Sequence, residues 1–258
     1  MVQLNERGDI NAASVGIYFI LTLLICVIFK RNGIRNSLAY TYVLLFTFVK
    51  VIGGAMTVYV QSTLDLTLYT PAAILGVVVL SPLMLGICLL LTPDKITVKN
   101  FRSFSASMAP KFFMVTRVSI FSALCIGIAG GLLVFTTHTT PEGVAKGQIL
   151  LRTAAGLAVS SWTLIYIAIF LLYPERHCIG LAYPVVAYMV MPAFMIRLAY
   201  GLGVASTFRT NLMQAFNPLG GSWIIFMCMA FLPEVFVTGS LVGIGLVSQK
   251  YSKLSESG

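Results

Sequence analysis

The chain has 258 residues, of which 58% are hydrophobic and only 10% are charged. Soluble domains carry about 25% charged residues, so this composition excludes an ordinary soluble fold with a water-facing surface. The formal charge of +9 does not indicate a nucleic-acid-binding protein. The basic residues lie in short segments between long apolar runs, where they report membrane topology.

Apolar runs recur along the chain, and each is long enough to cross a hydrocarbon core about 30 Å thick as an α-helix. Lipid offers no hydrogen-bond partners to the backbone, and the runs lack the alternation of barrel strands, so we expect helices. The sequence therefore predicts a single all-α domain over residues 1–258, a bundle of seven transmembrane helices. The predicted spans cover about residues 11–29, 38–60, 68–91, 112–136, 148–173, 181–206 and 222–247.

The connections between these spans are short and polar. Lys30–Arg35 is predicted to form a tight basic turn after the first span. The longest loop is expected from Thr92 to about Pro110. Pro141–Gly143 is predicted to turn the chain ahead of the fifth span, and Pro174–His177 to form a polar turn after it.

Lysine and arginine are unevenly divided between the two sides that the spans define. The richer side is expected to be the cytosolic one. The N-terminus is then outside or lumenal and the C-terminus cytosolic, as an odd number of spans requires. The predicted cytosolic set is Lys30, Arg31, Arg35, Lys95, Lys99, Arg102, Lys111, Arg176, Lys250 and Lys253. The opposite set is Arg7, Lys146, Arg152 and Arg209.

Three ionisable residues lie deep within predicted spans: Lys50 in the second, Arg197 in the sixth and Glu234 in the seventh. A charge at the centre of a transmembrane helix costs about 2.5 to 3.5 kcal/mol, so such residues usually face the bundle interior and pair with one another. The three lie at similar depth, and Glu234 could pair with either cation or with both.

Two interpretations of this cluster remain open. It is either a buried ion pair that fixes helix packing, or a site for a polar ligand or for proton transfer. Its charge sum of +1 would leave one cation for an anionic or electron-rich ligand group. Asp65, in a predicted lumenal loop, is a weaker candidate for the same cavity. Tyr200 follows Arg197 by three residues and so shares its helix face.

Helix-breaking residues surround the three charges. Pro82, Pro192 and Pro233 interrupt spans three, six and seven, and proline bends often open a cavity. Gly53–Gly54 and Gly130–Gly131 fit close packing between helices.

Several classes of site are missing from the sequence. The last span holds no lysine for a retinal Schiff base, and no phosphate-binding glycine-rich loop or aspartate-rich D-D-x-x-D motif occurs. His138 and His177 fall in loops on opposite sides of the membrane. We therefore expect no metal and no cofactor.

An ordered set of short motifs resembles a family of fungal seven-span membrane proteins that includes membrane-bound terpene cyclases of meroterpenoid pathways, such as the ascofuranone cyclase. The motifs extend over most of the chain. They are Asn32–Ser37, Lys50–Gly54, Leu80–Leu83, Gly130–Gly131, Arg197–Tyr200 and Pro233–Glu234.

This resemblance implies acid-initiated cyclisation of an epoxidised prenyl chain attached to a phenol, in an endoplasmic-reticulum or other endomembrane. The partners would be the lipid bilayer, a hydrophobic small-molecule substrate and other membrane enzymes of the pathway. Glu234 would be the catalytic acid, with Asp65 as the alternative, and Lys50, Arg197 and Tyr200 would position the substrate oxygen. An apolar site favours the protonated carboxyl group, whereas a neighbouring cation favours the carboxylate.

Two further functions fit the same features. Intramembrane charges and bent helices also suit a small-molecule or lipid transporter, although no inverted repeat is evident. A receptor-like sensor would share the seven spans and the external N-terminus, but the loops and the C-terminal tail are short.

Overall fold

The structure is a computed structural model that describes residues 6–32, 38–63, 68–92, 104–135, 140–176, 182–206, 216 and 221–256. The chain is helical over nearly all of these ranges, and no strand occurs within them. The predicted all-α fold is confirmed.

The elements follow one another through short connections. In chain order they are α1 (Glu6–Asn32), α2 (Leu38–Thr63), α3 (Tyr69–Val78), α4 (Leu80–Leu91), α6 (Phe104–Phe135), α7 (Pro141–Leu172), the 3-10 turn η2 (Tyr173–Glu175), α9 (Ala182–Val185), the π-helical η3 (Val186–Val190), α10 (Met191–Ser206), α12 (Trp223–Phe226), the π-helical η4 (Met227–Phe231) and α13 (Leu232–Glu256).

Seven stretches of the described chain are long and apolar enough to cross a membrane. Many large apolar side chains point outward from them: Met114 is 70% exposed and Phe170 is 64% exposed. Such a surface is stable against lipid and not against water. The chain is therefore an integral membrane protein, and which of its ends faces the cytosol stays a prediction. The stretches are Gly8–Arg31, Leu38–Thr63, Ile74–Leu91, Met108–Phe135, Pro141–Leu172, Ala182–Ser206 and Trp223–Val247.

Three helices begin earlier than the sequence patterns indicate, and α1 is one of them, since it begins at Glu6 and not near residue 11. α7 starts at Pro141, where a turn was expected, because the Thr140 hydroxyl caps it by accepting a hydrogen bond from the Gly143 amide at 3.2 Å. Proline fits the first helical position, since its missing N–H would have no partner there. α6 starts at Phe104 and continues through Pro110, so part of the expected long loop is helical.

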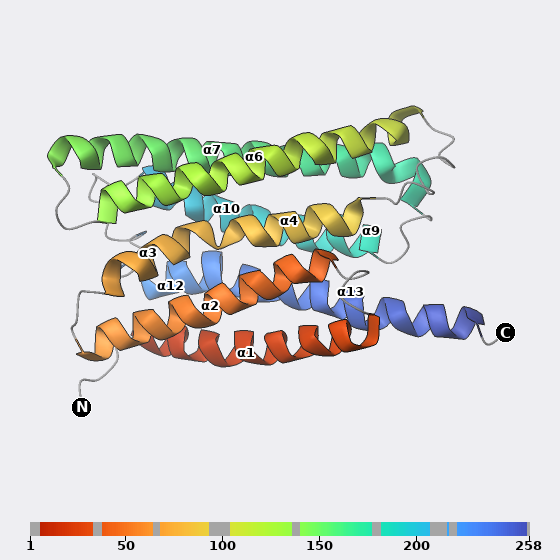
Figure 1. Cartoon of the computed structure of the whole chain (residues 1–258), viewed down its shortest axis with the longest axis horizontal. Helices are drawn as coiled ribbons and strands as arrows, with labels where there is room; N and C mark the ends of the chain where they lie inside the picture. The colour runs from red at the N-terminus through yellow and green to blue at the C-terminus, as the bar shows by residue number, and fades with distance from the viewer. Residues whose placement is uncertain are drawn as a thin grey trace.

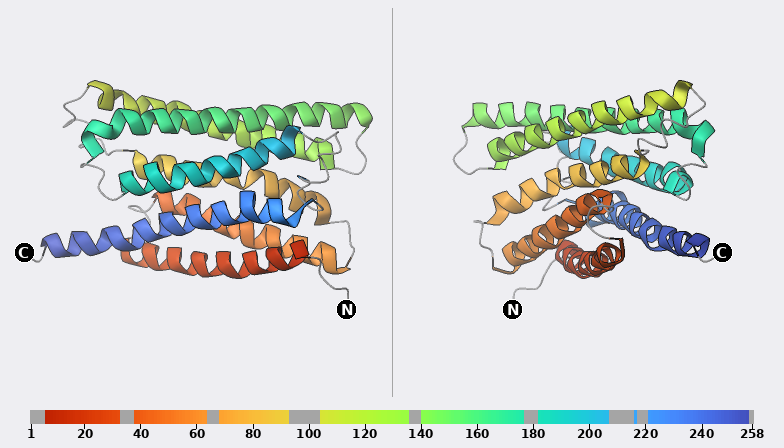
Figure 2. Two further views of the ribbon diagram at one scale, coloured as in Figure 1. Left: turned by 180° about the vertical axis from the view of Figure 1, so that it is seen from behind. Right: turned by 45° about the vertical axis from the view of Figure 1, so that its right-hand side comes forward.

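The helices form three layers (Figures 1 and 2). α6 and α7 run side by side along one edge, and α1 lies with α2 and α13 along the other. α3–α4 and α10 lie between these layers, since α4 contacts α2 and α6 while α10 contacts α7 and α13. α1 begins at one end of the bundle and α13 finishes at the opposite end, as an odd number of spans requires.

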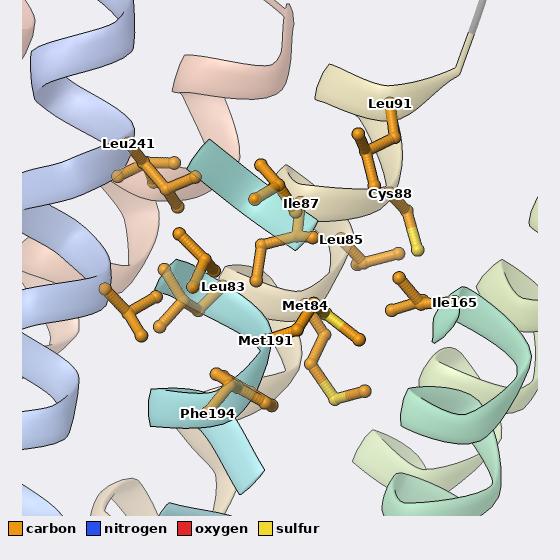
Figure 3. Close-up of a cluster of buried hydrophobic side chains, with 14 of the residues drawn as sticks. Leu83, Met84, Leu85, Ile87, Cys88, Leu91, Ile165, Met191, Phe194 and Leu241 are labelled. Atoms are coloured by element: carbon orange, nitrogen blue, oxygen red, sulfur yellow. The ribbon is translucent and has the colours of Figure 1, made fainter. Parts of the chain in front are cut away.

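The apolar core is centred on α4. Leu83 and Leu91 are fully buried, and every residue from Leu83 to Cys88 is buried, so α4 is covered by neighbours on all sides there. Figure 3 shows these side chains meeting Ile165 of α7, Phe194 of α10 and Leu241 of α13. α4 therefore holds the two outer layers together.

α6 and α7 approach most closely at a pair of glycines. A Cβ atom on Gly147 would lie 2.8 Å from Leu133 Cβ and 3.0 Å from the Gly130 carbonyl oxygen. A carbon atom cannot approach its neighbours this closely unless the backbone moves. The crossing of α6 and α7 therefore requires glycine at this position. The predicted close packing at Gly130 is borne out by this geometry.

Three spans are interrupted near the prolines. α3 ends at a turn at Val79, shortly before Pro82. η3 ends just before Pro192, and the Met191 amide bonds the Val186 carbonyl five residues back. η4 ends just before Pro233, and the Leu232 amide bonds the Met227 carbonyl in the same way. Single π-helical turns of this kind occur frequently at functional sites.

The glycine crossing gives a first prediction. Gly147→Ala should destabilise the protein by about 1 to 3 kcal/mol, because the added methyl overpacks the α6–α7 contact. Gly156→Ala on the same helix is the matched control, since nothing lies within 4 Å of its added Cβ. Alanine has the higher helix propensity, so the control should be neutral or stabilising. Thermal unfolding in detergent measures both, and equal stabilities would contradict the packing.

Candidate functional site

Glu234 lies in the first turn of α13, immediately after the π-helical η4 and Pro233. Its side chain is only 1% exposed. An isolated carboxylate at that depth is prohibitively costly, so its surroundings must supply opposite charge.

Both carboxylate oxygens of Glu234 meet a cation. Arg197 Nε of α10 donates to Glu234 Oε1 at 2.5 Å, and Lys50 Nζ of α2 pairs with Oε2. The Arg197 and Lys50 side chains are themselves 6% and 17% exposed. Helices α2, α10 and α13 thus converge on one buried ion-pair cluster of net charge +1. The three charges singled out from the sequence are brought together.

Tyr18 of α1 completes this cluster and was missed by the sequence analysis. It is fully buried, and its hydroxyl donates to Glu234 Oε2 at 3.4 Å. Its ring meets the ring of Phe46 edge to face, with centroids 5.6 Å apart. Lys50 Nζ lies 5.9 Å from both ring centroids, a distance at which the rings attract a cation.

A periodic signal for Tyr18 does exist in the sequence. Asn11, Ser14 and Tyr18 are spaced three and four residues apart, which places three polar side chains on one face of an otherwise apolar helix. The spacing alone does not say which other span that face meets.

Tyr200 packs beside Arg197 on the same helix, α10. The Arg197 guanidinium carbon lies 5.3 Å from the centroid of the Tyr200 ring. That ring also packs near Phe216 and Phe226, with centroids 6.0 and 6.3 Å away. The role predicted for Tyr200 in binding substrate stays a prediction. Asp65, the alternative acid, lies outside the described residues.

Two pockets flank the cluster, and Arg197 and Tyr200 line both of them. The first, here called the ion-pair pocket, lies between α1, α2, α3, α10 and α13, and its space of about 740 Å³ is partly open to the outside. Polar groups share its wall with apolar ones. They are Asn11, Ser14, Lys50, Thr57, Arg197 and Glu234.

The second, the small-residue pocket, lies between α4, α6, α7 and α10, and its space of about 900 Å³ is partly open to the outside. Its wall is mainly apolar, and among the described residues that line it only Arg197 is charged. Several of its walls are formed by alanine and glycine, which leave the space open. They are Gly76, Ala123, Gly127, Ala154, Ala155, Ala158 and Gly201.

The cluster is suited to hold oxygen-bearing groups and not a metal ion. Lysine and arginine carry N–H donors only, and they occupy both oxygens of the one carboxylate. Within the described ranges no three His, Cys, Asp or Glu side chains gather as metal ligands would.

Comparison with known proteins gives a family and no function. A protein-family model described as a domain of unknown function (DUF7702) matches residues 4–251. No curated protein and no solved structure matches the chain.

The ion-pair cluster predicts a large cost for removing its carboxylate. Glu234→Gln should destabilise the protein by about 3 to 5 kcal/mol, because it leaves two buried cations facing each other without a counter-charge. Thermal unfolding of the purified protein in detergent measures the loss.

The matched control is Glu142→Gln. Glu142 pairs with Lys146 at 2.8 Å on the exposed surface of α7, where both side chains are well over half exposed. Exposed pairs of this kind contribute at most about 1 kcal/mol. If both variants unfold at the same temperature, the buried cluster does not stabilise the bundle as described.

Proposed function

Because the chain belongs to the DUF7702 family, to which no function is assigned, we propose from its own site that it is a membrane-bound terpene cyclase. It would cyclise an epoxidised prenyl chain carried on a phenol. The buried Glu234, held between Lys50 and Arg197 on the wall of a pocket, is the feature that supports this proposal most. The resemblance to fungal seven-span cyclases supports the same class of reaction.

The location of the site fits such a substrate. An epoxidised prenyl chain is too apolar for water and dissolves in the bilayer. Both pockets lie among membrane-spanning helices, and the wall of the small-residue pocket is mainly apolar. The polar cluster lies where the two pockets meet and can hold the oxygen-bearing part of the substrate. The prenyl chain can then lie against the apolar part of the wall.

The reaction is an isomerisation and consumes no cofactor. A proton transferred to the epoxide oxygen breaks one C–O bond and leaves a carbocation. The π electrons of a neighbouring double bond then form the new C–C bond. The final cation loses one proton to a base, so protons taken up and released balance.

Glu234 can give a proton only after the cluster opens. Both of its oxygens are engaged by cations, so the carboxyl group is not poised to donate while both ion pairs are closed. A substrate oxygen that takes over Lys50 or Arg197 frees one carboxylate oxygen for a proton. Tyr18 is positioned beside that oxygen as a hydrogen-bond donor. Asp65 remains the alternative acid.

The proposed setting is an endoplasmic-reticulum or other endomembrane, with the N-terminus on the lumenal side. The ends of α1, α2 and α10 that line the two pockets would then lie in the lumenal half of the bundle. Other membrane enzymes of the pathway would be natural neighbours, because the substrate and the product stay in the lipid.

One observation favours transport as a second function. α3–α4, η3–α10 and η4–α13 are all interrupted beside the charged cluster. Broken helices next to intramembrane charges are typical of substrate sites in transporters. A transporter would carry the compound across the membrane unchanged, whereas a cyclase returns an isomer of equal mass.

Turnover by membranes of an expressing host tests the proposal. Wild-type membranes incubated with epoxidised prenyl-phenols should yield a cyclised isomer, detected by chromatography and mass spectrometry. Glu234→Gln should lower the rate per folded protein by about 10²- to 10⁴-fold, the usual contribution of an acid catalyst. Glu142→Gln should keep the wild-type rate.

Since Glu234→Gln is also expected to be unstable, Glu234→Asp is measured beside it. Aspartate keeps the charge and shortens the side chain, so the protein should fold and turn over slowly. Full turnover by Glu234→Gln would remove the residue from the chemistry. No product from wild-type membranes with any epoxidised prenyl-phenol would refute the proposed cyclase.

A further inference from the structure

Arg197 presents unused hydrogen-bond donors to the small-residue pocket. A guanidinium group has five N–H donors. Within the described residues, its only hydrogen bond runs from Nε to Glu234. The residue is only 5% exposed, so water does not freely solvate the remaining donors.

One of the two terminal nitrogens, Nη1, lies on the side of the guanidinium that faces the small-residue pocket. Nη1 lies 3.8 Å from the position that a Cβ on Gly201 would occupy, and Gly201 lines the pocket. The Tyr200 ring covers another side of the group. A buried cation is thus held by Glu234 at one edge and faces open space at the other.

The cluster carries one positive charge that no anion in it balances. Lys50 and Arg197 carry two positive charges against the single negative charge of Glu234. Buried charge without compensation is costly, and a bound anion would offset it. A carboxylate matches the planar fork of a guanidinium and supplies one negative charge. A phosphate monoester, at about −1.5 to −2, would overcompensate.

The remainder of the pocket accepts an apolar chain. Its alanine and glycine walls offer no hydrogen-bond partners from side chains. Besides Arg197, the described lining includes only Ser81 and Tyr200 with polar side-chain atoms, so an apolar chain can lie along most of the wall. Part of the pocket's space is open to the surroundings of the bundle, so a molecule dissolved in lipid can enter there. Leu202, which lines the pocket, is 38% exposed.

We propose that the small-residue pocket binds a long-chain carboxylate, with its anionic head on the free N–H donors of Arg197 and its chain between α6, α7 and α10. The binding does not depend on cyclisation, because it uses the edge of Arg197 that faces away from Glu234.

Photolabelling tests this site directly. The probe is a palmitic acid that carries a diazirine in mid-chain, added to the full chain in phospholipid nanodiscs, with adducts mapped by mass spectrometry. The acid should label the inner face of α7 at Ala154–Ala158. Its methyl ester should label this face at least about tenfold less, because the ester has no charge and loses the charge-assisted hydrogen bond to Arg197.

Two leucine substitutions on neighbouring residues of α7 form a matched pair. Ala155→Leu fills the pocket and should reduce labelling at least as much as esterification does. Gly156→Leu adds the same side chain at a position with nothing within 4 Å, and it should leave labelling unchanged. If Ala155→Leu does not fold, the comparison of acid with ester on the unaltered chain still decides.

Equal labelling by acid and ester overturns the proposal, and so does acid labelling confined to outward-facing residues such as Phe170. The outcome is independent of the cyclase. Labelling by the acid without turnover would support the carboxylate site and contradict the cyclase. Turnover without labelling by the acid would support the cyclase and contradict the carboxylate site.

Discussion

A carboxylate buried inside a bilayer-spanning bundle is the constraint on which the rest of this structure depends. The Glu234 side chain is only 1% exposed, so its charge must be met by side chains from other helices. Lys50 reaches it from α2, Arg197 from α10 and Tyr18 from α1. These three contacts fix the relative depth and rotation of four helices more specifically than apolar packing against lipid-like neighbours can.

The same contacts explain why the helices are irregular at this level. η3 and η4 each shift the backbone register immediately before a proline, shortly ahead of Arg197 and directly ahead of Glu234. The shifts help to turn both side chains inward at one depth. At the same level, Arg197 lines two pockets. The irregular helix turns and the buried charges thus lie at the same level of the bundle.

The sequence predicts the helices and the charged cluster well, because apolar length and the cost of an intramembrane charge are local properties of each span. It does not predict the contribution of Tyr18, since a tyrosine costs little in a helix and eleven occur in the chain. Nor does it predict the small-residue pocket. Ala123, Ala155 and Gly201 come from three helices. Small residues allow either close packing or an open pocket, and only the three-dimensional arrangement shows which of the two is formed.

The most direct measurement is the distance between a lysine side-chain nitrogen and a glutamate carboxyl carbon in lipid. Solid-state NMR of the chain with ¹⁵Nζ-lysine and ¹³Cδ-glutamate reports this dipolar coupling, and Glu142→Gln removes the known surface pair from the signal. A buried Lys50–Glu234 pair predicts strong coupling in that background and its loss in Lys50→Met. Absence of coupling before Lys50 is changed would contradict the ion-pair cluster and everything built on it.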